Sequence, residues 1–290
     1  MSPAPGDLVH YVRDICLPQP PDAQDQGRGH RHPAEGNFLP PSILSLKQGL
    51  KRLEYRGYDS AGIGIDGPRG NATMSLIKST GKVKALEDKI EAQKGELNVE
   101  GIHTQHVGIS HTRWATHGAP SDLNCHPHRS GDINEFIVVH NGIITNYKDI
   151  KKFLEAKGYV FESETDTECI AKLIRHIHSQ YPHYTFRQLV EQTISQLEGA
   201  FACVFKSTMY PGECVATRRG SPLLVGIKAE HGLESDSIPV QYSLEEHPKT
   251  YTHIPAELDP QASPLVPRKK TSAMFRVDSE HVSLIFPLPS

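Results

Sequence analysis

The chain alternates between segments with a clear apolar face and segments without one, and the first clear pattern is helical. Ile43, Leu46, Leu50 and Leu53 occur at i, i+3, i+7 and i+10, so they lie on one face of a helix. Gly57 is typical of the residue that follows a helix, so this helix should end beside it. Further helices are expected over 83–93, where the sequence is polar, over 146–157, and after Thr165 and Thr185.

Short apolar runs between these helices have the character of strands. The runs 60–66 and 73–78 flank a Gly-Pro-Arg-Gly-Asn turn, as in a β-hairpin. The most apolar run, 135–144, should be a buried strand. The remaining strands are expected over 107–110, 201–206, 214–218 and 223–228. Strands with mainly hairpin-like connections, together with the helices, predict an α+β domain over 42–228.

Two of the helix starts carry the pattern of a capping box. Thr165 is expected to accept from the N3 amide while Glu168 reaches back, and Thr185 and Gln188 take the same roles in the second box. With Thr165 at the cap, Asp166 is available for another partner, and the helix dipole stabilises its ionised form. The alternative is that Asp166 is an ordinary carboxylate at a helix start.

The two flanks of this domain differ from it in composition. The first, 1–41, and the second, 229–290, are interrupted by prolines and lack apolar periodicity. We therefore expect the first flank to be disordered or atypical and the second to be poorly ordered or truncated.

Composition excludes several classes of function. The chain has 31 basic and 34 acidic residues and a net charge of −3, which indicates neither a nucleic-acid surface nor an anionic-membrane surface. No apolar run approaches the roughly 20 residues of a membrane span, and no secretory signal is visible. The 5 cysteines are widely spaced without a CxxC pair, which favours a reducing cytosol over a disulfide framework or a structural zinc site.

Two closely spaced histidine pairs are the remaining candidates for a metal site. His126 and His128 flank a proline in an expected turn, and His176 and His178 would point to different faces of a helix. We interpret all four as structural or solvent-exposed, and we expect no metal and no cofactor.

The stretch HTRWATHG at 111–118 concentrates polar groups at the end of an expected strand. Arg113, Trp114 and His117 lie where a sheet can present them to a polar small molecule. A solvated turn with Trp114 in the core explains the same residues, and the stretch alone favours neither reading.

A substrate with a carboxylate, an ammonium and an amide, such as glutamine, would suit the polar residues of this chain. Arg113 can pair bidentately with a carboxylate, and Asp166 can accept from an ammonium. Asn141 and Gly142 can converge on an oxyanion, although Asn-Gly is also a common tight-turn pair. A nucleophile is missing, because Cys169, Cys203 and Cys214 have no histidine beside them in the sequence that would mark one of them as activated.

Several long motifs together resemble one enzyme family. They are RLEYRGYDSAG at 52–62, GKV at 81–83, HTRWATHG at 111–118, HNGII at 140–144, SETDTE at 163–168 and ATRRGSPL at 216–223. From about Leu44 to Lys228 the chain resembles the glutaminase half of the glutamine–fructose-6-phosphate aminotransferases. The resemblance implies a fold of the N-terminal-nucleophile hydrolase type, a four-layer αββα sandwich, here lacking terminal strands.

The resemblance also implies roles for individual residues in binding and hydrolysing glutamine. It repeats the roles already assigned to Arg113, Asp166, Asn141 and Gly142. Thr116 and His117 would complete the clamp on glutamine. Trp114 would gate the passage of ammonia, and Arg56 would support the nucleophile.

The chain departs from the family pattern at both ends. The family nucleophile is a cysteine in an N-terminal Cys-Gly-Ile, which occurs nowhere here, and Cys16 is followed by Leu-Pro. The sugar-isomerase domains that would follow are also missing, so we do not expect this chain to convert fructose 6-phosphate. Three hypotheses stay open: a glutaminase domain, a glutamine-binding module without activity, and a poorly folded product with exposed sheet edges.

Overall fold

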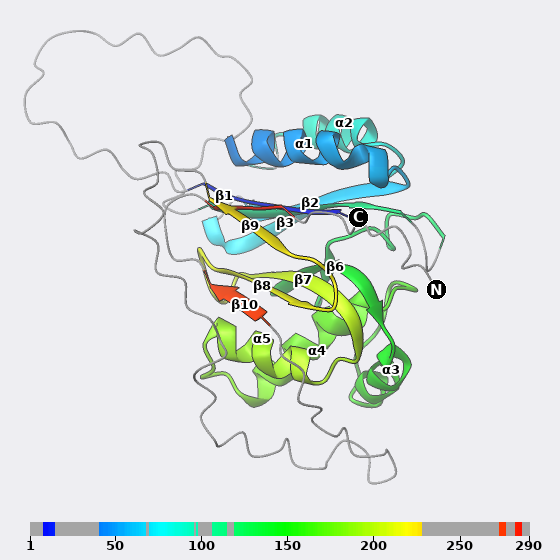
Figure 1. Cartoon of the computed structure of the whole chain (residues 1–290), viewed down its shortest axis with the longest axis vertical. Helices are drawn as coiled ribbons and strands as arrows, with labels where there is room; N and C mark the ends of the chain where they lie inside the picture. The colour runs from blue at the N-terminus through cyan, green and yellow to red at the C-terminus, as the bar shows by residue number, and fades with distance from the viewer. Residues whose placement is uncertain are drawn as a thin grey trace, which may run out of the picture.

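Two antiparallel sheets face each other in the computed structural model, and helices cover the outer side of each sheet (Figure 1). The structure describes residues 8–14, 41–67, 70–95, 97, 106–114, 119–227, 273–276 and 282–285. The four layers confirm the α+β sandwich expected from the sequence.

The first sheet has six strands, and every pairing between them is antiparallel. In spatial order these are β3 (Gly70–Thr80), β2 (Ser60–Gly67), β4 (His106–Arg113), β1 (Leu8–Asp14), β11 (Val282–Ile285) and β9 (Leu224–Ile227). Its outer side is covered by α1 (Pro41–Leu53) and α2 (Val83–Ala92), and the short 3₁₀ helix Glu54–Arg56 follows α1.

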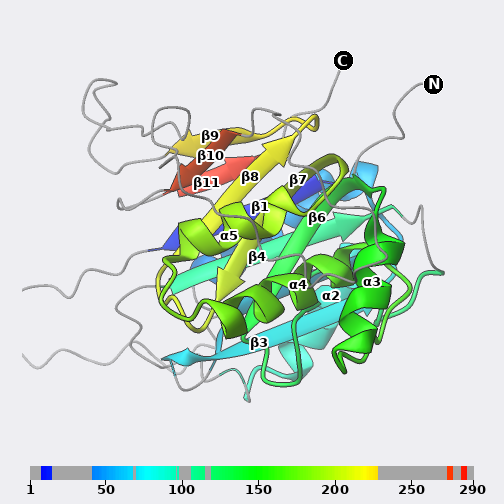
Figure 2. The ribbon, with the colours of Figure 1, turned by 90° about the horizontal axis from the view of Figure 1, so that it is seen from below.

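The second sheet has five strands, also paired antiparallel. Their order is β10 (Ala273–Arg276), β8 (Cys214–Arg219), β7 (Gly199–Ser207), β6 (Phe136–Ile144) and β5 (His128–Arg129). Figure 2 shows the helices α3 (Tyr147–Ala156), α4 (Thr167–Gln180) and α5 (Phe186–Ser195) lying across this sheet.

Three apolar clusters hold the four layers together. One lies between the first sheet and its helices, with Leu46 and Ile63 at its centre. A second joins the sheets through Ile109 and Val139, and a third packs α3, α4 and α5 on the second sheet around Phe136. Strand β6 is buried on both faces because alternate side chains enter different clusters, which explains its continuous apolar run.

A buried ion pair also joins the two sheets. Lys206 of β7 and Asp66 of β2 are 1% and 3% exposed, and the Lys206 ammonium donates to Asp66 Oδ1. The second oxygen, Asp66 Oδ2, accepts from the backbone N–H of Val107 at 2.8 Å. Both charges therefore have partners in the interior, as buried charges require.

Short strands in the flanks are the main difference from the expected organisation. No strand was predicted in 1–41 or 229–290, yet β1 is an inner strand of the first sheet and β11 pairs with it. These strands have only 7 and 4 residues, too few for an apolar pattern to stand out from proline-rich surroundings. Most of both flanks lies outside the described residues, and the boundaries at 42 and 228 stay predictions.

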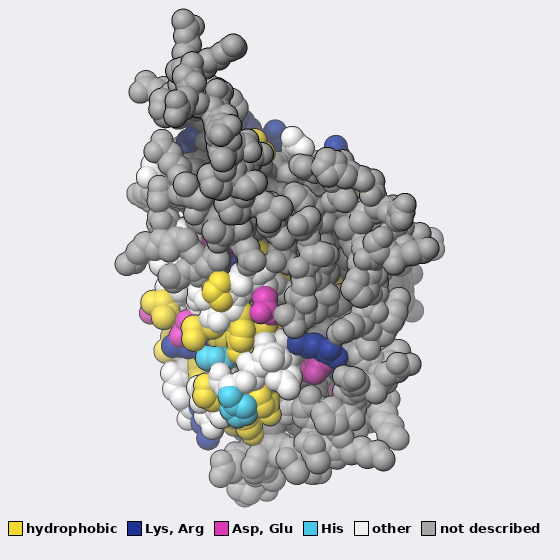
Figure 3. Space-filling view, turned by 90° about the vertical axis from the view of Figure 1, so that its left-hand side faces the viewer, with side chains coloured by type: hydrophobic (Ala, Val, Ile, Leu, Met, Phe, Trp, Pro, Cys, Tyr) yellow, Lys and Arg dark blue, Asp and Glu magenta, His cyan; other side chains and the backbone are white. Residues whose placement is uncertain are grey.

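No helix in the described part of the chain is long and apolar enough to span a membrane. On the face seen in Figure 3, the described side chains are of mixed type, with histidine, basic and acidic groups among hydrophobic ones. This part of the surface therefore has no concentration of a single charge.

Candidate functional site

Strand β4 ends with two polar side chains on the inner side of its sheet. Positions 111 and 113 share a face because side chains alternate along a strand. His111 Nε2 lies 2.7 Å from Asn141 Oδ1 of β6, so this face looks toward the second sheet. His111 and Arg113 are buried, whereas Trp114 is 36% exposed with its ring 5.3 Å from that of Tyr58. A buried guanidinium thus lies next to an exposed aromatic pair.

Asn141 and Gly142 lie within β6, and the tight-turn alternative for this pair is wrong. They pair with Ala202 and Phe201 of β7. Gly142 has a φ of 126°, and a Cβ at this position would come within 2.1 Å of the Ala200 carbonyl oxygen. Position 142 therefore requires glycine, both for its backbone conformation and for the close approach of β7.

Asp166 brings a carboxylate to the same end of β6. It occupies the N-cap position of α4, but its side chain makes no capping hydrogen bond. Its Oδ2 accepts from the backbone N–H of Ile144 at 2.9 Å, and its Oδ1 lies 3.8 Å from His140 Nδ1. The side chain is 14% exposed, so solvent or a small ligand can reach it.

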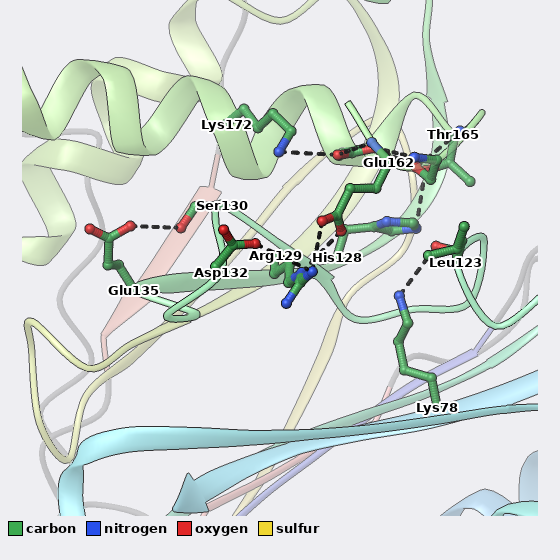
Figure 4. A network of polar contacts seen from close by, with 12 residues as sticks. Lys78, Leu123, His128, Arg129, Ser130, Asp132, Glu135, Glu162, Thr165 and Lys172 are labelled. Carbon is green, nitrogen blue, oxygen red and sulfur yellow. Dashed lines mark hydrogen bonds and ion pairs between the residues drawn. The ribbon is translucent and has the colours of Figure 1, made fainter. Parts of the chain in front are cut away.

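The first predicted capping box is wrong, while the second is confirmed at Thr185. No side chain caps α4. The Thr165 hydroxyl instead lies 3.0 Å from His128 Nε2 (Figure 4). Glu168 does reach back, but its carboxylate accepts from the backbone N–H groups of Glu162 and Ser163. These contacts hold the segment before α4 and so fix where Asp166 lies.

A continuous series of buried side chains connects Asp166 to Asn141. We call His140, Thr167, His126, His111 and Asn141 the histidine relay. Thr167 Oγ1 lies 2.9 Å from both His140 Nδ1 and His126 Nε2. The Nδ1 atoms of His126 and His111 are 3.0 Å apart, and His111 Nε2 makes the contact with Asn141.

Burial keeps the histidines of this region neutral. It lowers the pKa of His111 to about 3. The hydrogen bond with Asn141 opposes this shift, and the electrostatic effects of His140 and Arg113 add to it. Burial also lowers the pKa of His126, His128 and His140, and for His140 the Asp166 carboxylate opposes the shift. A neutral imidazole has one N–H donor and one acceptor nitrogen, so each ring can pass a hydrogen bond on.

The sequence interpretation of the two histidine pairs is only partly right. His126 and His128 are buried and hydrogen-bonded, so the solvent-exposed option is wrong for them. His176 and His178 pack against different aromatic rings, Phe153 and Phe136, as expected for two faces of α4. Among the described residues, no group of three or more His, Cys, Asp or Glu side chains could hold a metal ion.

Three predicted site residues cannot be placed. Thr116 and His117 lie outside the described residues, and for Arg56 only the backbone, in the 3₁₀ helix after α1, is described. Arg113, Asn141, Gly142 and Asp166 lie on β4, β6 and the start of α4.

Three of the four described cysteines are poor nucleophiles. Burial raises the pKa of Cys125 and Cys203 and raises that of Cys169 to about 12. Cys214 is half-buried at the start of β8, and Cys16 lies outside the described residues. A thiol with a raised pKa is protonated at neutral pH and therefore unreactive.

Comparison with known proteins identifies the family. Residues 112–218, which include the polar ends of β4, β6 and α4, match a glutamine amidotransferase domain. A Saccharomyces cerevisiae protein named as a glutamine–fructose-6-phosphate aminotransferase is 43% identical over 204 residues, which cover 69% of this chain and 77% of that protein. The chain belongs to the glutamine–fructose-6-phosphate aminotransferase family.

Longer members of the family are more similar in sequence. The rat aminotransferase 1 is 58% identical over 208 residues, and the human aminotransferase 2 is 57% identical over 204 residues. These matches cover 69% and 68% of this chain but 30% of each relative. The chain therefore spans about 30% of the length of these relatives.

Solved structures show the fold. The chain matches the glutamine phosphoribosylpyrophosphate amidotransferase of B. subtilis with a TM-score of 0.50 and 22% identity, over 77% of this chain and 40% of that one. An allosteric regulatory enzyme of purine biosynthesis matches with a TM-score of 0.52 and 19% identity, with the same coverage. These likenesses confirm the N-terminal-nucleophile type of αββα sandwich.

Proposed function

We propose that this domain binds glutamine at the end of β4, β6 and α4. The observation that carries the proposal is the convergence of two contacts between elements: His111 of β4 with Asn141, and Asp166 of α4 with the backbone of Ile144. Together they bring a guanidinium, a carboxylate and an amide to one end of the sandwich.

The α-carboxylate and the α-ammonium of glutamine would bind at separate groups. Arg113 supplies a planar fork of N–H donors for the carboxylate. Asp166 supplies a carboxylate for the ammonium, and the 14% exposure of its side chain leaves it accessible. Thr116 and His117 would complete this clamp, Trp114 would gate the release of ammonia and Arg56 would support a nucleophile, as the family resemblance implies.

The side-chain carbonyl of glutamine would face Asn141 and Gly142. Gly142 is solvent-exposed directly beside the buried Asn141, so a ligand can approach this part of β6. The Asn141 amide and the Gly142 N–H are the donors we assign to the carbonyl oxygen, and to the oxyanion if the amide is attacked.

Glutamine binding is better supported than hydrolysis by the described residues. Hydrolysis requires a reactive thiol or hydroxyl, and burial raises the pKa of three of the described thiols. We therefore propose a domain that binds glutamine and in which these thiols do not hydrolyse it. Glutaminase activity is the second candidate, favoured by membership of an amidotransferase family.

Production of glucosamine 6-phosphate is a property that the resemblance implies for the longer family members. Because this chain spans about 30% of two such relatives, the fructose 6-phosphate reaction is not assigned to it. We propose that this chain shares the glutamine site with those longer family members. A cytosolic location is supported by Cys125, Cys169 and Cys203, which are free thiols.

Isothermal titration of the purified chain with glutamine tests the binding proposal. We expect heat of binding, and Arg113→Lys or Asp166→Asn should weaken the affinity by about 10- to 150-fold, the equivalent of one charged hydrogen-bonded contact. Arg187→Lys on α5 and Asp149→Asn on α3 are the matched controls and should bind as the parent does.

Two results separate the candidates. A folded chain, judged by circular dichroism, that gives no heat with glutamine would overturn the binding proposal. Release of glutamate from glutamine above the buffer rate would instead support glutaminase activity, and the assay is run on the same samples.

A further inference from the structure

The histidine relay crosses the interior from α4 to β6. Every side chain in it is buried: His111 is 0%, Thr167 1%, His140 2%, His126 5% and Asn141 7% exposed. The five residues lie on α4, β4 and β6 and in the segment before β5, so the relay is not a local feature of one element.

The direction of the hydrogen bonds in the relay depends on which neighbour receives the Thr167 hydroxyl proton. Each neutral imidazole donates from one nitrogen and accepts at the other. The single Thr167 hydroxyl proton can serve His126, His140 or Asp166 Oδ1, which lies 3.4 Å from Thr167 Oγ1. If Thr167 donates to His126 Nε2, His140 Nδ1–H donates to Thr167, and His126 Nδ1–H donates to His111 Nδ1. His111 Nε2–H then donates to Asn141, which must present its Oδ1. The reverse direction exchanges every donor and acceptor and turns the Asn141 amide over.

Thr167 Oγ1 lies closer to His126 Nε2, at 2.9 Å, than to Asp166 Oδ1, at 3.4 Å, so we assign its proton to a histidine. Two observations at the His140 end then select the first direction over its reverse. His140 Nδ1 lies 3.8 Å from Asp166 Oδ1, where an N–H is attracted to the carboxylate and a lone pair is repelled. The other nitrogen, Nε2, is buried and has no hydrogen-bond partner among the described residues. In the first direction this atom is an acceptor, whereas in the reverse direction it is a buried N–H donor, and orphaned buried donors are the rarer case.

We infer that the relay orients the Asn141 side chain, with His111 as a positioning residue for the glutamine site. Because His111 donates to Oδ1, the amide nitrogen of Asn141 lies on the branch away from His111. This orientation makes Asn141 a donor toward its ligand, which is what a glutamine carbonyl requires. The inference rests on the proposed function for the identity of the ligand, but the direction of the relay does not.

Nuclear magnetic resonance of the imidazole nitrogens tests the direction without any ligand. In the parent chain labelled with ¹⁵N-histidine, we expect His140 and His126 to carry their proton on Nδ1 and His111 to carry it on Nε2. The reverse direction gives the opposite tautomer at all three rings, and donation from Thr167 to Asp166 gives it at His126 and His111. A proton on Nδ1 of His111 would therefore overturn the inference. Thr167→Val should disturb the tautomers of His140 and His126, whereas Thr167→Ser keeps the hydroxyl and should preserve them.

Comparing the affinities for two ligands separates the effect of the Asn141 orientation from an effect on binding as a whole. Norvaline keeps the α-carboxylate and α-ammonium of glutamine and has a methyl group in place of the amide. The parent chain should therefore bind glutamine more tightly than norvaline. His111→Leu should reduce this preference by about tenfold, the effect of one hydrogen bond, while leaving the affinity for norvaline unchanged.

Matched variants distinguish the loss of the His111 hydrogen bond from a general loss of folding. His111→Gln retains a side-chain amide donor and should restore most of the preference for glutamine. His128→Gln alters a buried histidine outside the relay and should leave the preference intact. If His111→Leu is folded and still prefers glutamine as the parent does, the positioning role is refuted. If no variant and no parent sample binds either ligand, the proposed function fails instead, while the tautomer measurement still decides the direction of the relay.

Discussion

Substitution of Gly142 by alanine should destabilise the domain through two separable effects. The φ of 126° is a conformation that residues with a Cβ rarely adopt, and strained backbone of this kind costs about 1–3 kcal/mol. The new Cβ would also lie 2.1 Å from the Ala200 carbonyl oxygen, so β6 and β7 must separate locally. Forcing two paired strands apart at this point is a form of overpacking, which adds about 1–3 kcal/mol. We therefore expect Gly142→Ala to lower the free energy of unfolding by about 2–6 kcal/mol.

Gly158→Ala is the control that isolates the backbone effect. Gly158 also has a positive φ, 88°, but a Cβ there would meet nothing within 4 Å. This variant should lose only the conformational part, on the order of 1 kcal/mol.

Thermal unfolding followed by circular dichroism compares the two variants. For a domain of this size about 1 kcal/mol lowers the midpoint by roughly 2–4 °C, so Gly158→Ala should shift by that amount and Gly142→Ala by clearly more. Equal shifts for the two variants would show that the approach of β7 to position 142 has no energetic effect and would refute the reasoning. A parent chain without a cooperative transition would favour the poorly folded hypothesis.

Two further predictions concern buried charges and histidines. Lys206→Met leaves the Asp66 carboxylate buried and should destabilise the domain by about 3–5 kcal/mol in urea unfolding, while adding Asp66→Asn, which keeps an acceptor for Val107 N–H, should recover part of this loss. Destabilisation by less than about 1 kcal/mol in the single variant would contradict this. Burial holds the pKa of His111 at about 3 and also lowers the pKa values of the other three buried histidines. Below pH 6.5 the unfolded chain therefore binds more protons than the folded chain. Stability should fall as the pH decreases through this range. Between pH 7.5 and 5.5 His111, with its pKa of about 3, contributes about 1.4 kcal/mol of this loss. His128→Gln should reduce the total loss, and an unchanged loss would count against the assignment.

The apolar pattern predicts the elements that carry the site. The helix at 41–53, the hairpin of β2 and β3 and the doubly buried β6 all follow from periodicity and turn residues. The residue types at the ends of β4 and β6 also indicate a polar ligand. This works because these features are local, within one turn or one strand.

The histidine relay could not be predicted from the sequence, because its contacts join residues that are far apart in the chain. His111 and His126 are separated by 15 positions, and His140 and Thr167 by 27. Histidine is common both in cores and at surfaces, so its position in the sequence gives no burial signal. The capping box at Thr165 failed for a related reason, since a buried partner, His128, competes for the hydroxyl that would otherwise cap the helix.

The site combines two kinds of contact between sheets that have different consequences. Apolar pairs such as Ile109 and Val139 hold the sheets together but specify no direction, because dispersion and burial are not directional. The hydrogen bond from His111 to Asn141 joins the same two sheets and also has a sense, since one atom must donate. An apolar residue at position 111 could therefore preserve the fold without orienting the amide. A buried polar connection between the sheets at this point is explained by the orientation that it imposes on Asn141, and its energetic benefit to the fold is secondary.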